Sequence, residues 1–207
     1  MVSASKQVAE APPASVSPKE RAWPVARANA RISAYLVDSV ILLAFILASF
    51  VIAGAQILLR SDLGRGEPPD SAYYAFIAIL LGGSLLTWTA FNLALMRWRG
   101  QTAGMYVIGI RAVSEDATAL TTGRALIRWF ALHPLLFHPF LLPLWAVFSL
   151  LVVSFTLSQV VLVVTLALAL LCLVSPAASL LTVLLDSERR APHDRLARTM
   201  VVHLEQP

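Results

Sequence analysis

An arginine and an aspartate stand at the beginning of a long apolar stretch of the chain. Arg31 and Asp38 belong to the segment RISAYLVD, and no charged side chain occurs between Asp38 and Arg60. At a rise of about 1.5 Å per residue, a helix over this stretch spans the roughly 30 Å hydrocarbon core of a bilayer. A carboxylate inside a membrane helix costs roughly 2.5 to 3.5 kcal/mol on insertion scales. Asp38 is therefore the first candidate for a functional ionisable group.

The spacing of the two charges argues against a direct pair between them. Arg31 lies seven positions before Asp38, on nearly the same helix face. Long side chains in a helix lean toward its N-terminus, and the helical rise separates the two positions by about 10 Å. We therefore expect a cation from another segment to meet Asp38, with Arg111 and Arg195 as first choices. Arg31 in turn is expected to meet Asp194. There are two alternatives for these charges. They form a site that binds an ion or a proton, or they form ion pairs that hold the helices and the carboxyl-terminal tail together.

Asn92 is the polar side chain near the inner end of a second apolar stretch, which runs without a charge from Ser71 to Met96. Its amide is able to reach across to Asp38 by a hydrogen bond. A plain structural bond within the helix bundle is the alternative.

Composition places the chain in a membrane and gives no sign of an enzyme. Hydrophobic residues make up 58% of the sequence and charged residues 14%. Soluble domains are about 45–50% apolar and about 25% charged. The net charge of +4 comes from basic residues that flank apolar stretches, which favours an anionic membrane surface over nucleic acid as the partner.

His133 and His138 lie about 140° apart around a helix and do not form a metal-binding face. Cys172 is the single cysteine. We expect no catalytic residues, metal or cofactor.

Four membrane helices are predicted from the apolar stretches. No Asp, Glu, Lys or Arg occurs from Trp129 to Leu185. Because one span takes about 20 residues, this stretch has room for two spans, with a break near residues 154–159. The predicted helices cover about residues 32–59, 72–96, 135–153 and 159–185.

The polar segments complete the predicted domain organisation. Residues 97–128 form an insertion in which Tyr106–Val113 is expected to be a strand because of its β-branched residues. A helix lying in the membrane interface is expected to begin near Gly123. Thr199–Leu204 is a second expected strand, which pairs with the first. The domains are a disordered tail of residues 1–30, a membrane domain of residues 31–203 and a short tail of residues 204–207.

The distribution of basic residues predicts the orientation. Fourteen of the sixteen Lys and Arg residues fall before residue 32, in the 97–128 insertion or after residue 185. Basic residues concentrate on the cytoplasmic side of membrane proteins. Four spans with both termini in the cytoplasm satisfy this count.

Four short motifs, taken in order, resemble the RDD family of bacterial membrane proteins. They are RISAYLVD, GQTAG followed by GIRAV, TGRALIR and HDRLARTMVV. The family is named for an arginine and two aspartates, which match Arg31, Asp38 and Asp194. Met105 stands where the family usually has a lysine, so a role that depends on that lysine is in doubt. The glycine-rich motif of the family corresponds to Gly100, Gln101, Thr102, Gly104 and Gly109.

The resemblance implies a multi-pass protein of the bacterial cytoplasmic membrane, often described as a transporter, with cation/proton antiport proposed for some members. We therefore expect an all-α membrane protein of four transmembrane helices with a small cytoplasmic β-containing insertion and an interfacial helix. The expected function is that of a small transporter or transporter subunit coupled to a cation or proton through Asp38. The alternative is a non-transporting scaffold or assembly factor. The expected partners are the lipid bilayer and either a second copy of the chain or another membrane protein, and not nucleic acid.

Overall fold

Three of the described helices are long and apolar enough to cross a membrane. The computed structural model describes residues 24–116, 118–154 and 159–204. The three helices are α1 (Ala28–Arg60), the continuous helix Asp70–Arg99 and α7 (Gln159–Leu185), with 33, 30 and 27 residues. The second of these consists of α2 (Asp70–Ile77), a π-helical segment η2 (Ala78–Gly83) and α3 (Ser84–Arg99). The first, second and last predicted spans are thereby confirmed as long apolar helices.

The third predicted helix is shorter than expected. The segment 135–153 does not begin as an α-helix, because Leu135 and its neighbours form turns and Pro139 opens a short 3-10 helix, η3 (Pro139–Leu141). Proline lacks the backbone N–H that a helix interior requires. The α-helix α6 (Leu142–Ser154) then has 13 residues. Most of the predicted break at residues 154–159 lies outside the described residues.

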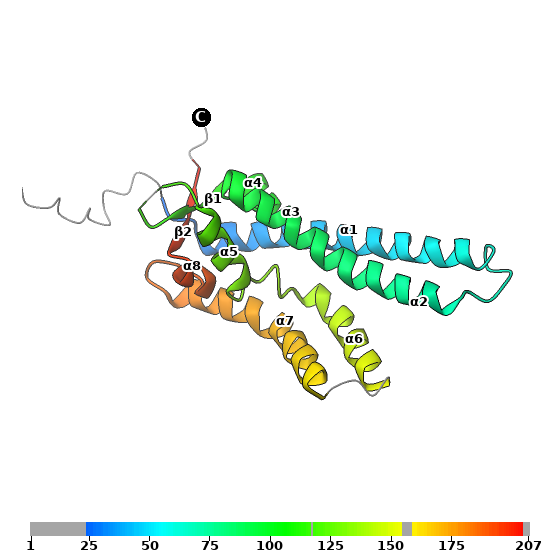
Figure 1. Ribbon diagram of the computed structural model, residues 1–207. Helices are drawn as coiled ribbons and strands as arrows, with labels where there is room; N and C mark the ends of the chain where they lie inside the picture. The colour runs from blue at the N-terminus through cyan, green and yellow to red at the C-terminus, as the bar shows by residue number, and fades with distance from the viewer. Residues whose placement is uncertain (1–23, 117, 155–158, 205–207) are drawn as a thin grey trace, which may run out of the picture.

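The connection between α5 (Thr122–Phe130) and α6 is tied to three long helices by hydrogen bonds. Trp88 Nε1 in α3 donates to the Leu135 carbonyl at 2.8 Å, and Ser175 Oγ in α7 donates to the Leu132 carbonyl at 2.6 Å. Ser39 Oγ in α1 lies 2.8 Å from His138 Nε2. Buried carbonyls in an irregular segment need such partners. This connection therefore holds the α1–α3 hairpin and the α6–α7 hairpin together where they diverge (Figure 1).

A two-stranded sheet lies at the end of the molecule where α1 begins (Figure 1). β1 (Ile110–Ser114) and β2 (Thr199–His203) pair antiparallel, with Ile110 opposite His203 and Ser114 opposite Thr199. The predicted pairing of the two strands is confirmed. The predicted strand Tyr106–Val113 is wrong over its first residues, which belong to helix α4 (Ala103–Ile108). Thr102 caps this helix, and Gly109 ends it in the left-handed region at φ 73°, so the strand starts only at Ile110.

The last part of the predicted disordered tail is ordered. Ala26 N donates to the Val201 carbonyl at 2.8 Å, and Val25 forms a bridge with Val202. Residues 24–27 thus lie along β2 and fix the start of α1 at Ala28, before the predicted boundary at residue 31. Residues 1–23 lie outside the described residues, as does nearly all of the short tail 204–207.

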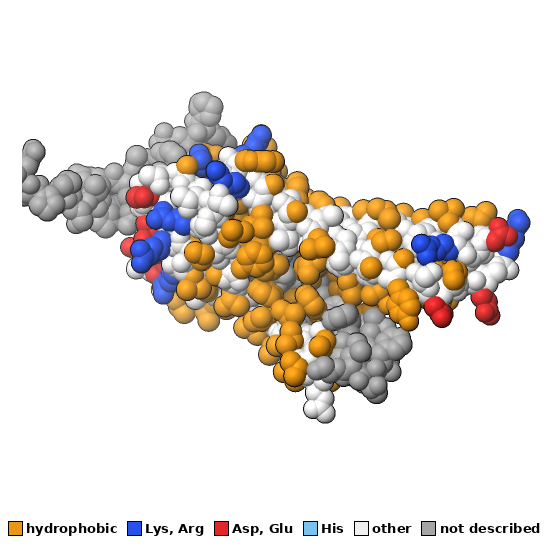
Figure 2. Space-filling view, viewed as in Figure 1, with side chains coloured by type: hydrophobic (Ala, Val, Ile, Leu, Met, Phe, Trp, Pro, Cys, Tyr) orange, Lys and Arg blue, Asp and Glu red, His pale blue; other side chains and the backbone are white. Residues whose placement is uncertain are grey.

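Two short helices complete the end that carries the sheet. α5 (Thr122–Phe130) begins after Thr121, whose side chain accepts from Arg124 N, in agreement with the predicted start near Gly123. α8 (Pro192–Leu196) follows the end of α7. Figure 2 shows hydrophobic side chains along the helices, while charged side chains gather at this end and at the loop between α1 and α2. An apolar body with charged ends matches the two environments of a membrane-spanning protein.

Candidate functional site: a cavity with two buried carboxylates

One buried carboxylate is held by two arginines from different elements. Asp194 in α8 is fully buried, and its Oδ2 accepts from Arg31 Nη1 in α1 at 2.6 Å. Its Oδ1 accepts from Nη1 of Arg128 in α5, which also donates to Thr199 Oγ1 at 2.9 Å. The amide of Ala191 donates to Oδ2 at 3.1 Å. The cluster therefore joins the start of α1, the end of α5, the helix α8 and the strand β2.

The predicted contact between Arg31 and Asp194 is present, whereas Arg128 was not predicted as part of the site. Arg124 and Arg128, which the sequence places on one side of a helix, have different roles. Arg124 is half-buried and lies 3.7 Å from Asp116, whereas Arg128 is 1% exposed. Its neighbours in the buried face of α5 are Ala125 and Trp129. The sequence signal was its position directly before Trp129, a large apolar side chain in the helix that begins near Gly123.

Burial changes the ionisation of the groups around this cluster. Burial, and then the charge of Arg31, lower the pKa of Arg128 to about 9, which leaves the guanidinium charged at neutral pH. His133 and His193 face each other with ring centroids 4.6 Å apart. Burial, followed by neighbouring positive groups, holds the pKa of both imidazoles well below 6.5, so both are neutral at neutral pH.

The second buried carboxylate, Asp38 in α1, is held by neutral donors alone. Asp38 is 2% exposed. Its Oδ2 accepts from Thr102 Oγ1 at 2.5 Å and its Oδ1 from Gly104 N at 2.7 Å. Among the described residues, no Lys, Arg or His nitrogen forms an ion pair with its oxygens. The carboxylate thus occupies the N-terminal end of α4, where backbone N–H groups have no partner within the helix.

The expected partners of Asp38 are a correction to the sequence prediction. Arg195 is 55% exposed and pairs with Asp186 at 2.9 Å. Arg111 lies in β1, opposite Val202, and its side chain packs over Gly100. Asn92 donates to the Trp88 carbonyl at 3.1 Å within its own helix, which is the structural alternative. None of the three meets Asp38, whose donors are instead the Thr102 hydroxyl and the Gly104 amide.

The glycine-rich motif builds the loop that presents these donors. Gly104 lies so close to α1 that a Cβ on it would collide with the Ala34 carbonyl oxygen and stand 2.8 Å from the Asp38 carboxyl carbon. Only glycine allows α4 to approach α1 in this way. Gln101 Nε2 donates to the Ile110 carbonyl at 2.9 Å and ties the loop to β1. Gly100 ends α3 and Gly109 ends α4.

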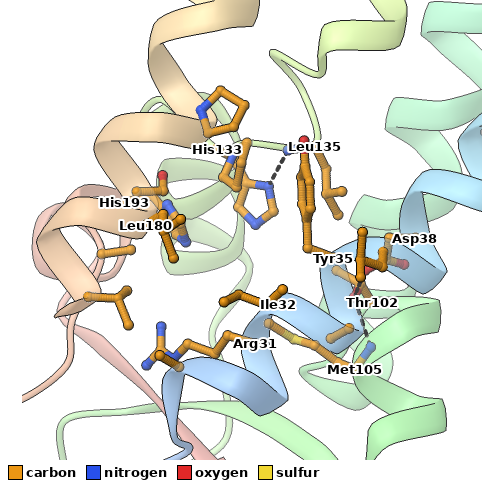
Figure 3. A pocket seen from close by; sticks show the side chains of 18 of the residues that line it. Arg31, Ile32, Tyr35, Asp38, Thr102, Met105, His133, Leu135, Leu180 and His193 are labelled. Carbon is orange, nitrogen blue, oxygen red and sulfur yellow. Dashed lines mark hydrogen bonds between the residues drawn. The ribbon is translucent and has the colours of Figure 1, made fainter.

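A cavity of about 390 Å³ separates the two carboxylate sites. It lies between α1 and the last third of α7 and is lined at one side by Asp38 and Thr102 and at another by Arg31, Arg128 and His193. Figure 3 shows Tyr35 and Ile32 of α1 facing the space between these groups, with Leu180 of α7 on the opposite side. Met105 also lines the cavity. It occupies the position at which the resemblance led us to expect a lysine. Within the described residues, no group of three His, Cys, Asp or Glu side chains is placed to hold a metal ion.

Residues 25–198 of the chain match the family model described as the RDD family. The match includes Arg31, Asp38 and Asp194 and the whole lining of the cavity. No curated protein and no solved structure matches the chain.

Proposed function

Because the chain belongs to the RDD family, whose model covers the membrane helices and the cavity together, we propose that it is a small membrane transporter or transporter subunit in which Asp38 binds a proton or cation. The observation that carries this proposal is a buried carboxylate beside a cavity with no cationic partner among the described residues. Ionisable groups inside a membrane span most often belong to ion or proton pathways. An acid held by a hydroxyl and an amide keeps the freedom to exchange a proton, which an ion pair would remove.

The topology that fits this function has four crossings and both termini in the cytoplasm. α3 and α7 both end at the end of the molecule that carries the sheet, while α7 begins away from the sheet, near the tip of the diverging α6–α7 hairpin (Figure 1). The chain between α5 and α7 therefore runs away from the sheet to reach the start of α7, and α6 with η3 is the segment that does so. The basic residues gather on the side of the sheet, which the positive-inside rule places in the cytoplasm of a bacterial inner membrane.

A second candidate is a scaffold or assembly factor that transports nothing. The observation in its favour is that the hydrogen bonds of Asp38 also join α1 to the start of α4. The carboxylate therefore stabilises the packing of these two helices whether or not it exchanges a proton. In this case the diverging hairpins would contact another membrane protein or a second copy of the chain.

A flux assay in liposomes separates these functions. The purified chain is reconstituted with a pH-sensitive dye inside, and a Na⁺ or proton gradient is imposed. We expect flux from the native chain and none from Asp38→Asn at an equal folded yield, because the Asn carbonyl still accepts from Gly104 N. The matched control is Asp62→Asn, which removes an exposed acid from the loop far from the cavity.

Equal flux from the native chain and from Asp38→Asn contradicts the role of the carboxylate. Absence of flux from the native chain, together with a lower folded yield of Asp38→Asn, favours the scaffold.

A further inference from the structure

The cavity between α1 and α7 combines two kinds of surface. Its walls are mainly apolar, with Ile32 and Leu36 on α1 and Leu180 and Val183 on α7. One side of it is formed by the polar cluster of Arg31, Arg128 and His193. Its volume is about 390 Å³. Small-molecule sites have volumes of about 300–1,000 Å³ and are typically apolar with few polar groups. The cavity therefore has the size and the lining of a ligand site.

Several nitrogens of the polar cluster are buried and have no hydrogen-bond partner among the described residues. They are Nε and Nη2 of Arg31, Nε of Arg128 and Nδ1 of His193. Arg128 and His193 are 1% and 5% exposed. Buried donors that are left unpaired are costly, and native proteins rarely tolerate a group of them at one place. The cluster therefore has unused capacity to donate hydrogen bonds to an acceptor.

The charges of the cluster also leave an excess of one positive unit. Arg31 and Arg128 share the single carboxylate of Asp194. Asp186 pairs with Arg195, and its charge also acts on Arg31. Asp38 lines another side of the cavity, where Thr102 and Gly104 bind it. An anion bound at the two guanidinium groups would balance the excess positive charge of the cluster.

We propose that the cavity binds an amphipathic anion, with its carboxylate or phosphate at Arg31 and Arg128 and its acyl chain between α1 and α7. Guanidinium groups favour carboxylate and phosphate because their N–H donors match the spacing of the anion's oxygens. The apolar walls exclude water from the chain of the amphiphile. Binding of this molecule does not require transport, whereas its role as the transported substrate rests on the proposed function.

Native mass spectrometry of the full chain in neutral detergent tests the proposal. The probes are oleate, its neutral analogue methyl oleate, phosphatidylglycerol and inorganic phosphate. We expect the protein to retain oleate or phosphatidylglycerol at one site and to retain methyl oleate at least about tenfold less, because the charge-assisted bonds are lost. Which of the two anions is retained distinguishes a free fatty acid from a membrane lipid.

Two variants connect retention to the cavity. Leu180→Trp fills the cavity without touching the charges, and Leu181→Trp is its matched control, because Leu181 is exposed and does not line the cavity. Retention at least about tenfold weaker in Leu180→Trp and unchanged in Leu181→Trp supports the site. Arg128→Gln should weaken retention as well. If Arg128→Gln does not fold, the tryptophan pair still decides.

Three results would overturn the proposal: equal retention by both tryptophan variants, equal retention of oleate and methyl oleate, or binding of inorganic phosphate alone. The same variants are measured for flux, so the two ideas fail separately. Flux without retention of any amphiphile rejects this inference only, and retention without flux rejects the transport function only.

Discussion

Two aspartates are buried at the same end of this molecule, and they are satisfied in opposite ways. Asp194 meets two guanidinium groups and one amide, which bring together α1, α5 and α8. Asp38 meets one hydroxyl and one amide and has no cation within ion-pair distance among the described residues. The first arrangement fixes a negative charge in place, while the second lets the acid exist with or without its charge.

The difference indicates which of the two acids is free to act. An ion pair in a buried place is strongly disrupted when one partner is removed, because the other charge remains uncompensated. Neutral donors do not need a charged acceptor. A protonated Asp side chain, or an Asn in its place, still has a carbonyl oxygen that accepts a hydrogen bond from them. Asp194 therefore joins helices, and Asp38 is the acid to which the proposed function gives a chemical role.

The largest expected effect is the loss of a cation from the Asp194 cluster. Arg128→Met removes the hydrogen bonds of Nη1 with Asp194 and Thr199 from a fully buried site. Because hydrogen bonds to charged groups contribute about 1.5–3 kcal/mol each, we expect the free energy of unfolding to fall by about 3–5 kcal/mol. The measurement is the thermal midpoint and folded yield in detergent. Arg195→Met is the control, because its exposed pair with Asp186 contributes about 1 kcal/mol or less. Equal losses in the two variants would show that the buried cluster is not the structural centre.

A smaller loss is expected from Gly104→Ala, which acts on the other acid. The new methyl group would collide with the Ala34 carbonyl oxygen, so α4 must move away from α1 and the bonds to Asp38 must lengthen. Overpacking of this kind costs about 1–3 kcal/mol. Gly123→Ala in α5 meets nothing within 4 Å. This control should be neutral or stabilising by about 0.5–1 kcal/mol. A thermal midpoint of Gly104→Ala equal to that of the native chain would contradict the close approach.

Acid should destabilise the protein through the two buried histidines. The pKa of His133 and of His193 lies well below 6.5 in the folded chain, so below pH 6.5 the unfolded chain binds protons that the folded chain does not. Stability is therefore complete above this pH and falls below it, by about 1.4 kcal/mol per pH unit for each histidine. Thermal midpoints from pH 8 to pH 5 check this. His193→Asn should flatten the slope, because one of the two buried imidazoles is then absent. A slope that His193→Asn leaves intact would reject the assignment.

The smallest effect on stability is expected from Asp38→Asn. The amide oxygen still accepts from Gly104 N, so the loss is about that of one ordinary hydrogen bond, about 0.5–1.5 kcal/mol. The same detergent melts measure it beside Arg128→Met. If Asp38→Asn is as damaging as Arg128→Met, the two acids have the same structural role and the contrast between them disappears.

The sequence predicted the positions of three long helices, the strand pair and the contact of Arg31 with Asp194. The lengths of the apolar stretches predict the helices, and the positions of the charged residues indicate the contact. It did not predict α4, because the β-branched residues after Tyr106 favour a strand, whereas the cap at Thr102 and the left-handed Gly109 determine a short helix. The 13-residue length of α6 depends on the turns around Leu135, which tertiary hydrogen bonds hold.

The partner of Asp38 was mispredicted for a related reason. Arg111 and Arg195 were expected to meet Asp38 because they carry the opposite charge. The backbone amide of Gly104 carries no net charge and was not expected as a partner, although the glycine in the motif indicates a close approach of two backbones. Arg128 was overlooked as a partner of Asp194 because its burial depends on how α5 packs against α8 and β2.

Infrared difference spectroscopy of the purified protein tests most directly whether Asp38 exchanges a proton. The carbonyl stretch of a protonated carboxyl group is recorded as the sample is acidified, for the native chain and for Asp38→Asn. We expect a carboxylic acid band in the native chain that is missing from Asp38→Asn. Identical difference spectra from the two proteins would show that Asp38 does not take up a proton and would contradict the proposed role.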